Sequence, residues 1–80
     1  MSAANAMWTL IRESGLDGTF YGDFFGRTHE PLVVQAREYV AYWMHQQGFS
    51  YPEIARVMRR PWHTSVLAMA RRYEARKVAA

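Results

Sequence analysis

Residues 56–72 combine two kinds of side chain that recognise nucleic acid. Short hydrogen-bonding groups stand together at His63, Thr64 and Ser65, and such groups can contact the base edges in the major groove of duplex DNA. Arginines surround them, and a guanidinium group pairs well with phosphate. We therefore expect the polar residues to read bases and the arginines to contact phosphates, the candidates being Arg56, Arg59, Arg60 and Arg71.

Trp62, directly before His63, has two interpretations. Its indole ring could pack on a sugar or on a thymine methyl group, which would add Trp62 to the base-reading residues. It could equally fold into the hydrophobic core. The sequence leaves both open.

The basic residues are concentrated in the last third of the chain. The 80 residues carry a net charge of +3. Residues 1–55 hold three Arg against six Asp and Glu, whereas residues 56–80 hold six Arg and one Lys against Glu74 alone. Such an asymmetry favours a polyanionic partner. The alternative is a basic segment that is merely solvated.

A helix over residues 61–77 would position the candidate residues. Val66, Ala70 and Tyr73 follow the i, i+4, i+7 spacing, which predicts that this side of the helix faces the core. The polar residues at its start, His63 among them, then face outward. In a helix-turn-helix, such residues reach base edges from the start of the second helix.

A short helix is expected to precede it, opening at Ser50. Ser50 and Glu53 have the spacing of a capping box, in which each side chain accepts a hydrogen bond from the backbone N–H of the other residue. The run Arg59-Arg60-Pro61 interrupts this helix, because proline cannot continue one. A short helix followed by a longer basic helix predicts a helix-turn-helix.

A long helix is expected from Pro31 to Gly48. Proline is well tolerated at a first helical position, and glycine commonly ends a helix in the left-handed conformation. Apolar residues at helical spacing predict a buried stripe made of Val33, Ala36 or Arg37, Val40, Trp43 and Met44.

Residues 5–14 predict a further short helix that ends at Gly15. Residues 15–30 contain four of the five glycines, which favours an irregular segment anchored by Phe20, Tyr21, Phe24 and Phe25. The fold class expected is all-α, a small helical bundle containing a helix-turn-helix. Its organisation would be an N-terminal helix and aromatic-rich segment, residues 1–30, packed on a DNA-binding domain of residues 31–80.

Residues 36–73 resemble the C-terminal DNA-binding domain (domain IV) of the bacterial replication initiator DnaA. The resemblance implies a DnaA-like or Trp-repressor-like helix-turn-helix, in which His63, Thr64 and Ser65 read bases and Arg37 contacts a phosphate. The similar pieces cover just under half of the chain. They are Ala36-Arg37 with Tyr42, the run Gly48-Phe49-Ser50-Tyr51-Pro52-Glu53-Ile54, and His63-Thr64-Ser65-Val66 with Ala70 and Arg71.

The departures from that family concern the residues before His63. The family has Arg-Asp where this chain has Pro61-Trp62, and a glycine pair near the place of Arg59 and Arg60. Because that Asp takes part in reading the initiator's binding box, its replacement argues against specificity for that box, and arginines in place of the glycine pair favour phosphate attraction over base discrimination. The family also places a basic arm in the minor groove, a role that the resemblance implies for Arg27.

The sequence argues against an enzyme and against a cofactor. No Gly-rich phosphate loop ending in GK[ST] is present, and no pair of side chains has the spacing of a nucleophile and its base. His29, His45 and His63 lack metal-ligand spacing, and there is no cysteine. We therefore expect no metal, no cofactor and no small-molecule substrate.

No apolar run approaches the length of a membrane span, so no membrane partner is expected. A chain without cysteine fits a reducing compartment, and the expected location is cytoplasmic, in association with the nucleoid.

The expected function is double-stranded, sequence-specific DNA binding by a transcriptional regulator of the phage or gene-transfer-agent type, with residues 61–77 as the recognition helix. One alternative is the origin-binding module of a replication initiator. Another is a helical protein-interaction domain. A partner in the transcription machinery, or a second copy of the chain, stays open as a protein partner.

Overall fold

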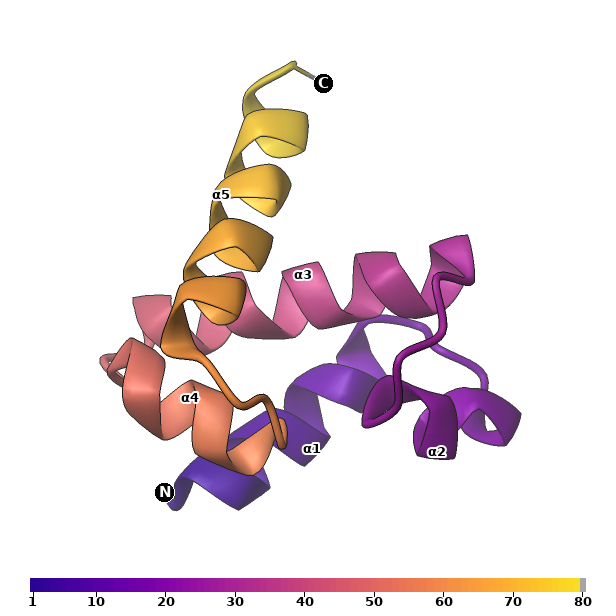
Figure 1. The fold of residues 1–80 in the computed structure, drawn as a ribbon, viewed down its shortest axis with the longest axis horizontal. Coiled ribbons are helices and arrows are strands. Elements are labelled where there is room, and N and C mark those ends of the chain that lie inside the picture. The colour runs from indigo at the N-terminus through magenta and orange to yellow at the C-terminus, as the bar shows by residue number, and fades with distance from the viewer. Residues whose placement is uncertain (80) are drawn as a thin grey trace.

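The helix α3, Pro31–Gln46, is the element against which the other helices pack (Figure 1). The computed structural model describes residues 1–79, and these residues form five α-helices, a short 3₁₀ turn at Gly18–Phe20 and no strand. The remaining helices are α1 (Ala3–Glu13), α2 (Tyr21–Phe24), α4 (Tyr51–Val57) and α5 (His63–Ala79). The prediction of a small all-α bundle is confirmed.

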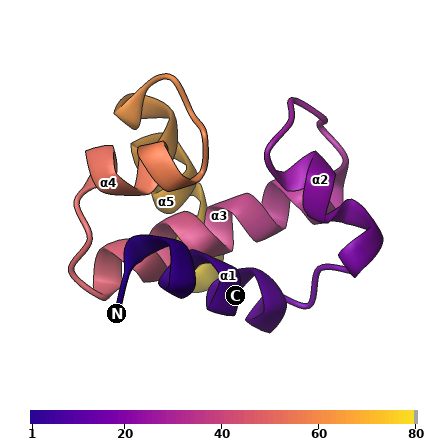
Figure 2. The ribbon, with the colours of Figure 1, turned by 90° about the horizontal axis from the view of Figure 1, so that it is seen from below.

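The helix α5 crosses α3 steeply and extends away from the rest of the molecule (Figure 1). Seen from below, α1 lies across α3 and beside α4, while α5 runs away from the viewer behind α4 (Figure 2). The first half of α5 therefore packs on the bundle, and its second half is mostly exposed.

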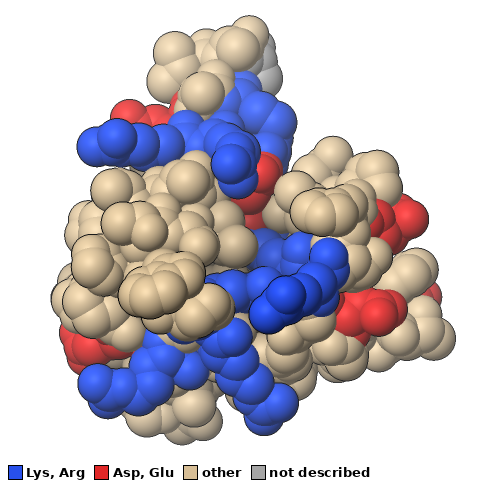
Figure 3. Space-filling model, viewed as in Figure 1, with Lys and Arg blue, Asp and Glu red and all other residues tan. Residues whose placement is uncertain are grey.

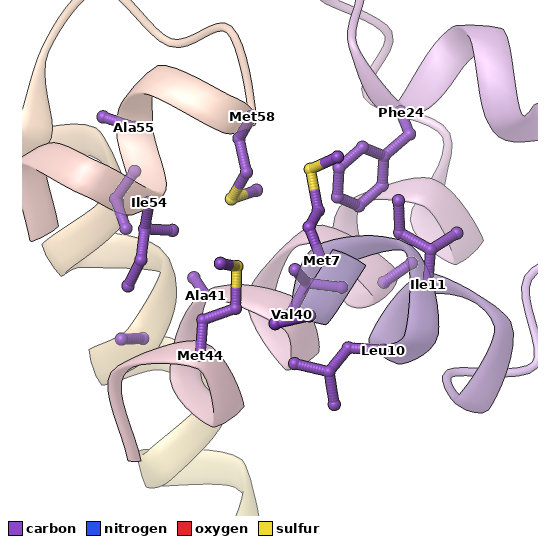
Figure 4. Packing of buried hydrophobic residues seen from close by; sticks show 14 of the residues in the cluster. Met7, Leu10, Ile11, Phe24, Val40, Ala41, Met44, Ile54, Ala55 and Met58 are labelled. Atoms are coloured by element: carbon purple, nitrogen blue, oxygen red, sulfur yellow. The ribbon is translucent and has the colours of Figure 1, made fainter. Parts of the chain in front are cut away.

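One hydrophobic core is built by residues from all five helices. Phe24, Ile11 and Met44 are among its largest fully buried side chains, and Figure 4 shows how α1, α2, α3 and α4 contribute to it. Val66 and Ala70 add the buried stripe of α5. Residues 1–30 thus share their core with the helices that follow.

The predicted caps are confirmed. Gly15 and Gly48 have φ of +83° and +102°, the left-handed region that suits glycine. Both hydrogen bonds of the capping box between Ser50 and Glu53 are formed. The helix α1 begins earlier than predicted because the Ser2 hydroxyl accepts from the Asn5 N–H.

Two predicted core residues lie instead at the edge of the core. Trp43 and Tyr73 are half-buried, and the Trp43 Nε1–H donates to the Tyr73 hydroxyl at 3.2 Å. Such rings keep their polar atom near the surface while the carbon framework packs. Residues 15–30 are more regular than predicted, because they contain the 3₁₀ turn and the one-turn helix α2. Phe24 is fully buried, as expected of a ring that anchors the segment.

Candidate nucleic-acid interface

The chain turns sharply between α4 and α5 at Arg59. The Arg59 N–H donates to the Arg56 carbonyl, and the Arg60 N–H donates to the Ala55 carbonyl, the two bonds of a Schellman motif. Arg59 has φ of +58°, the one non-glycine residue at positive φ among residues 1–79. Pro61 and Trp62 follow, and α5 begins at His63, two residues later than expected, with the Trp62 carbonyl accepting from the Ser65 N–H.

The first turn of α5 presents its polar side chains to solvent. His63 and Thr64 are exposed, Ser65 is half-buried, and Val66 is fully buried. Trp62 is 69% exposed, so its indole does not fold into the core. The arrangement that the spacing predicted for this turn is therefore present.

A shallow pocket of about 230 Å³ lies between α4 and the start of α5. His63 lines it on the α5 side, with Arg56 on the α4 side and Arg60 in the turn. An anion placed there would meet three groups that can donate hydrogen bonds.

Many basic side chains lie on one face of the molecule. Figure 3 shows Lys and Arg side chains on the face viewed in Figure 1, over α4, across the middle and along α5, with the acidic residues mostly toward the edges. Arg56, Arg59 and Arg71 are exposed. The Arg59 guanidinium lies 4.7 Å from the centre of the Phe25 ring, a cation–π contact that orients it.

Arg60 is held between the turn and α2. Its Nη2 donates to the Phe24 carbonyl at 2.7 Å, while its Nε is buried and has no hydrogen-bond partner among residues 1–79. Burial, and to a smaller extent the charge of Arg27, lower the pKa of Arg60 from its ordinary value. The group stays charged at neutral pH because an arginine pKa begins so high.

Arg37 does not contact phosphate, which corrects the expectation drawn from the resemblance. The side chain is only 5% exposed. Its guanidinium donates to four backbone carbonyls, those of Asp23, Phe24, Gly26 and Thr28, at 2.8–3.1 Å. Arg37 thus fixes the segment between α2 and α3, and burial lowers its pKa, with a further contribution from Arg60.

Arg27 lies in the segment that Arg37 holds. It is exposed and lines a second pocket together with His29, Arg60 and Arg72. Arg72 is absent from the candidates that the sequence suggested, although its i+7 spacing from Ser65 places the two on one side of α5. That spacing is the signal that would have identified it.

The last two basic side chains of α5 are engaged within the fold. Arg76 forms an ion pair with Glu38, which is buried on α3. The Lys77 ammonium lies 5.3 Å from the Tyr42 ring centre and 5.0 Å from that of Trp43. These two charges stabilise the packing of α5 on α3.

Among the described residues, no three His, Cys, Asp or Glu side chains are grouped so as to hold a metal ion. No helix within residues 1–79 has the length and apolar character needed to cross a bilayer.

Comparisons with protein-family models, with curated proteins and with solved structures find no match to this chain.

Proposed function

We propose that this chain is a double-stranded DNA-binding domain in which α4 and α5 act as a helix-turn-helix. The helix α5 would lie in the major groove with its first turn against the bases. The observation that carries the proposal is the exposure of His63 and Thr64 at the start of a helix flanked by exposed arginines.

The side chains divide into two groups by reach and chemistry. His63, Thr64 and the half-buried Ser65 offer short donors and acceptors to base edges, and the exposed ring of Trp62 can contact a thymine methyl group. Phosphate contacts would come from the longer guanidinium groups, which fix register without reading sequence. These are Arg56, Arg59, Arg60 and Arg71.

Salt dependence tests this proposal directly. Fluorescence anisotropy of a labelled duplex should show tight binding at low salt. The log-log slope of affinity against salt should be steep, about −0.9 for each phosphate contacted. Four arginine contacts to phosphate would give a log-log slope of about −3.6. An absence of duplex binding at low salt, or a flat salt response, would refute DNA binding as the function.

A role in transcription is the biological setting that we favour, in a regulator of the phage or gene-transfer-agent type. The resemblance to DnaA domain IV also allows an origin-binding module. Pro61 and Trp62 stand where that family uses Arg-Asp to read its box. Competition with duplexes containing the initiator box distinguishes the two roles, and preferential binding to that box would favour replication.

Protein interaction is a second candidate function, favoured by the exposed Trp62. A tryptophan that is 69% exposed beside Arg59 has the composition of an interface hot spot. The partner could belong to the transcription machinery or be a second copy of the chain. Binding to a protein partner should persist at salt concentrations that dissociate the chain from DNA, so pull-downs at raised salt separate the two functions.

A further inference from the structure

A second pocket lies beside α5, on the side facing the segment that precedes α3. Its volume is about 320 Å³. Val34 and Met69 supply an apolar surface, and the other lining residues are charged or titratable. These are Arg27, His29, Arg37, Glu38, Arg60 and Arg72.

The positive charge of this pocket is not balanced by its lining. Glu38, its one acidic lining residue in the described chain, is already paired with Arg76. The Arg37 guanidinium already donates hydrogen bonds to four backbone carbonyls. Arg27, Arg60 and Arg72 are therefore the cations left to attract an anion.

The electrostatics of Arg60 agree with an anion site. Its Nε is buried and lacks a hydrogen-bond partner within residues 1–79, a state that costs free energy until an acceptor is supplied. The like charge of Arg27 adds to the effect of burial in lowering the Arg60 pKa. An anion between Arg27 and Arg60 would relieve the repulsion between their charges.

We infer that this pocket holds one deoxyribose-phosphate unit of the DNA backbone bordering the groove that α5 enters. The inference rests on the proposed function. A helix in a major groove about 12 Å wide has a sugar-phosphate strand on each side. Arg72 is exposed on α5 and Met69 is half-buried on the same helix, so the pocket that they line borders α5, where such a strand would run. The apolar surface suits the sugar, and the guanidinium groups suit the phosphate.

Arg27 is assigned a phosphate by this arrangement, in place of the minor-groove contact that the resemblance implied. The helix α5 and the segment before α3 would then contact the DNA backbone from two sides. Arg37 acts as a positioning residue, because it fixes the backbone that carries Arg27.

Duplexes in which one phosphate is replaced by an uncharged methylphosphonate test whether the pocket binds a backbone phosphate. The native chain and an R27Q/R72Q variant are titrated with duplexes of a sequence selected for binding from a random pool. In these duplexes, single phosphates are replaced in turn by methylphosphonate. The control variant is R12Q, which removes an exposed arginine on α1. We expect R27Q/R72Q to bind unmodified DNA about tenfold more weakly, and its salt slope to be less negative by about 0.9. It should also become insensitive to methylphosphonate at one position only, while R12Q keeps the native pattern.

The two proposals fail in different ways. If R27Q/R72Q keeps native affinity, salt slope and methylphosphonate pattern while His63→Ala loses specific binding, the pocket assignment is overturned and the proposed function stands. If the native chain binds no duplex at low salt, both are overturned.

Discussion

Arg59 adopts a backbone conformation that glycine adopts more easily. Its φ of +58° lies in the left-handed region, where a non-glycine residue costs on the order of 1–3 kcal/mol. A guanidinium at this position gains the contact with Phe25 and an exposed place on the basic face. A contribution of Arg59 to the proposed DNA binding would account for a strained residue at this position.

Comparison of Arg59→Gly with Arg59→Ala separates these two effects. Both variants lose the guanidinium, so both should weaken binding to all duplexes about equally. Arg59→Gly should be the more stable by about 1 kcal/mol, because only glycine relieves the left-handed strain. Urea unfolding and anisotropy measure the two quantities. Equal stability of the variants would contradict the strain argument, and native affinity in either would remove Arg59 from the interface.

Thr64 and His63 should control specificity. Replacing either by alanine should cost about 1–3 kcal/mol on the selected sequence and little on random DNA. Both side chains are exposed, so the free energy of unfolding should stay within about 0.5 kcal/mol of native. Anisotropy with both duplexes measures the effect, and Gln46→Ala on α3 is the control. An equal loss on both duplexes would show that these residues do not read sequence.

At the scale of elements, the predictable part of the fold came from local signals. Glycines at 15 and 48 and the box between Ser50 and Glu53 mark helix ends within a few residues of chain, and the structure has them where predicted. The role of Arg37 could not be predicted this way. Its four carbonyl acceptors lie 9 to 14 residues earlier in the chain, and only tertiary packing brings them together.

Arg37 should therefore be a stability residue. Arg37→Met keeps an unbranched apolar side chain, although a shorter one, and removes every guanidinium donor. The Gly26 and Thr28 carbonyls then lose the hydrogen bond that they accept from Arg37, and the free energy of unfolding should fall by about 3 kcal/mol or more. Arg37→Lys should not restore stability, because one ammonium cannot replace the planar fork of guanidinium donors. Urea unfolding tests both. A loss below about 1 kcal/mol for Arg37→Met would contradict the role assigned to these bonds.

The capping box at α4 makes stability depend on pH. Hydrogen bonds from the Ser50 backbone and side chain lower the pKa of Glu53, with a further contribution from Arg56. The folded pKa lies below the unfolded one, so this contribution is present at neutral pH and is lost as pH falls through the acid range. Glu53→Gln should thus differ most from native at neutral pH and converge with it in acid. Unfolding curves against pH measure this, and a constant difference would contradict it.

At the scale of the molecule, the basic residues are divided by the way α5 packs. Arg76 and Lys77 face α3 and stabilise the bundle. Arg56, Arg59 and Arg71 are instead exposed, and basic side chains lie over α4, across the middle and along α5 on the face seen in Figure 3. The concentration of basic residues in the last third of the chain predicted a polyanionic partner. Which charges are available to it follows only from the crossing of α5 over α3.

The central claim is that the start of α5 reads base sequence in duplex DNA. Selection of bound duplexes from a random pool, using the purified chain, tests it most directly. We predict enrichment of one short shared motif, and loss of that enrichment in Thr64→Ala while R12Q retains it. Recovery of an unenriched pool would contradict sequence reading, and recovery of no duplex would contradict DNA binding altogether.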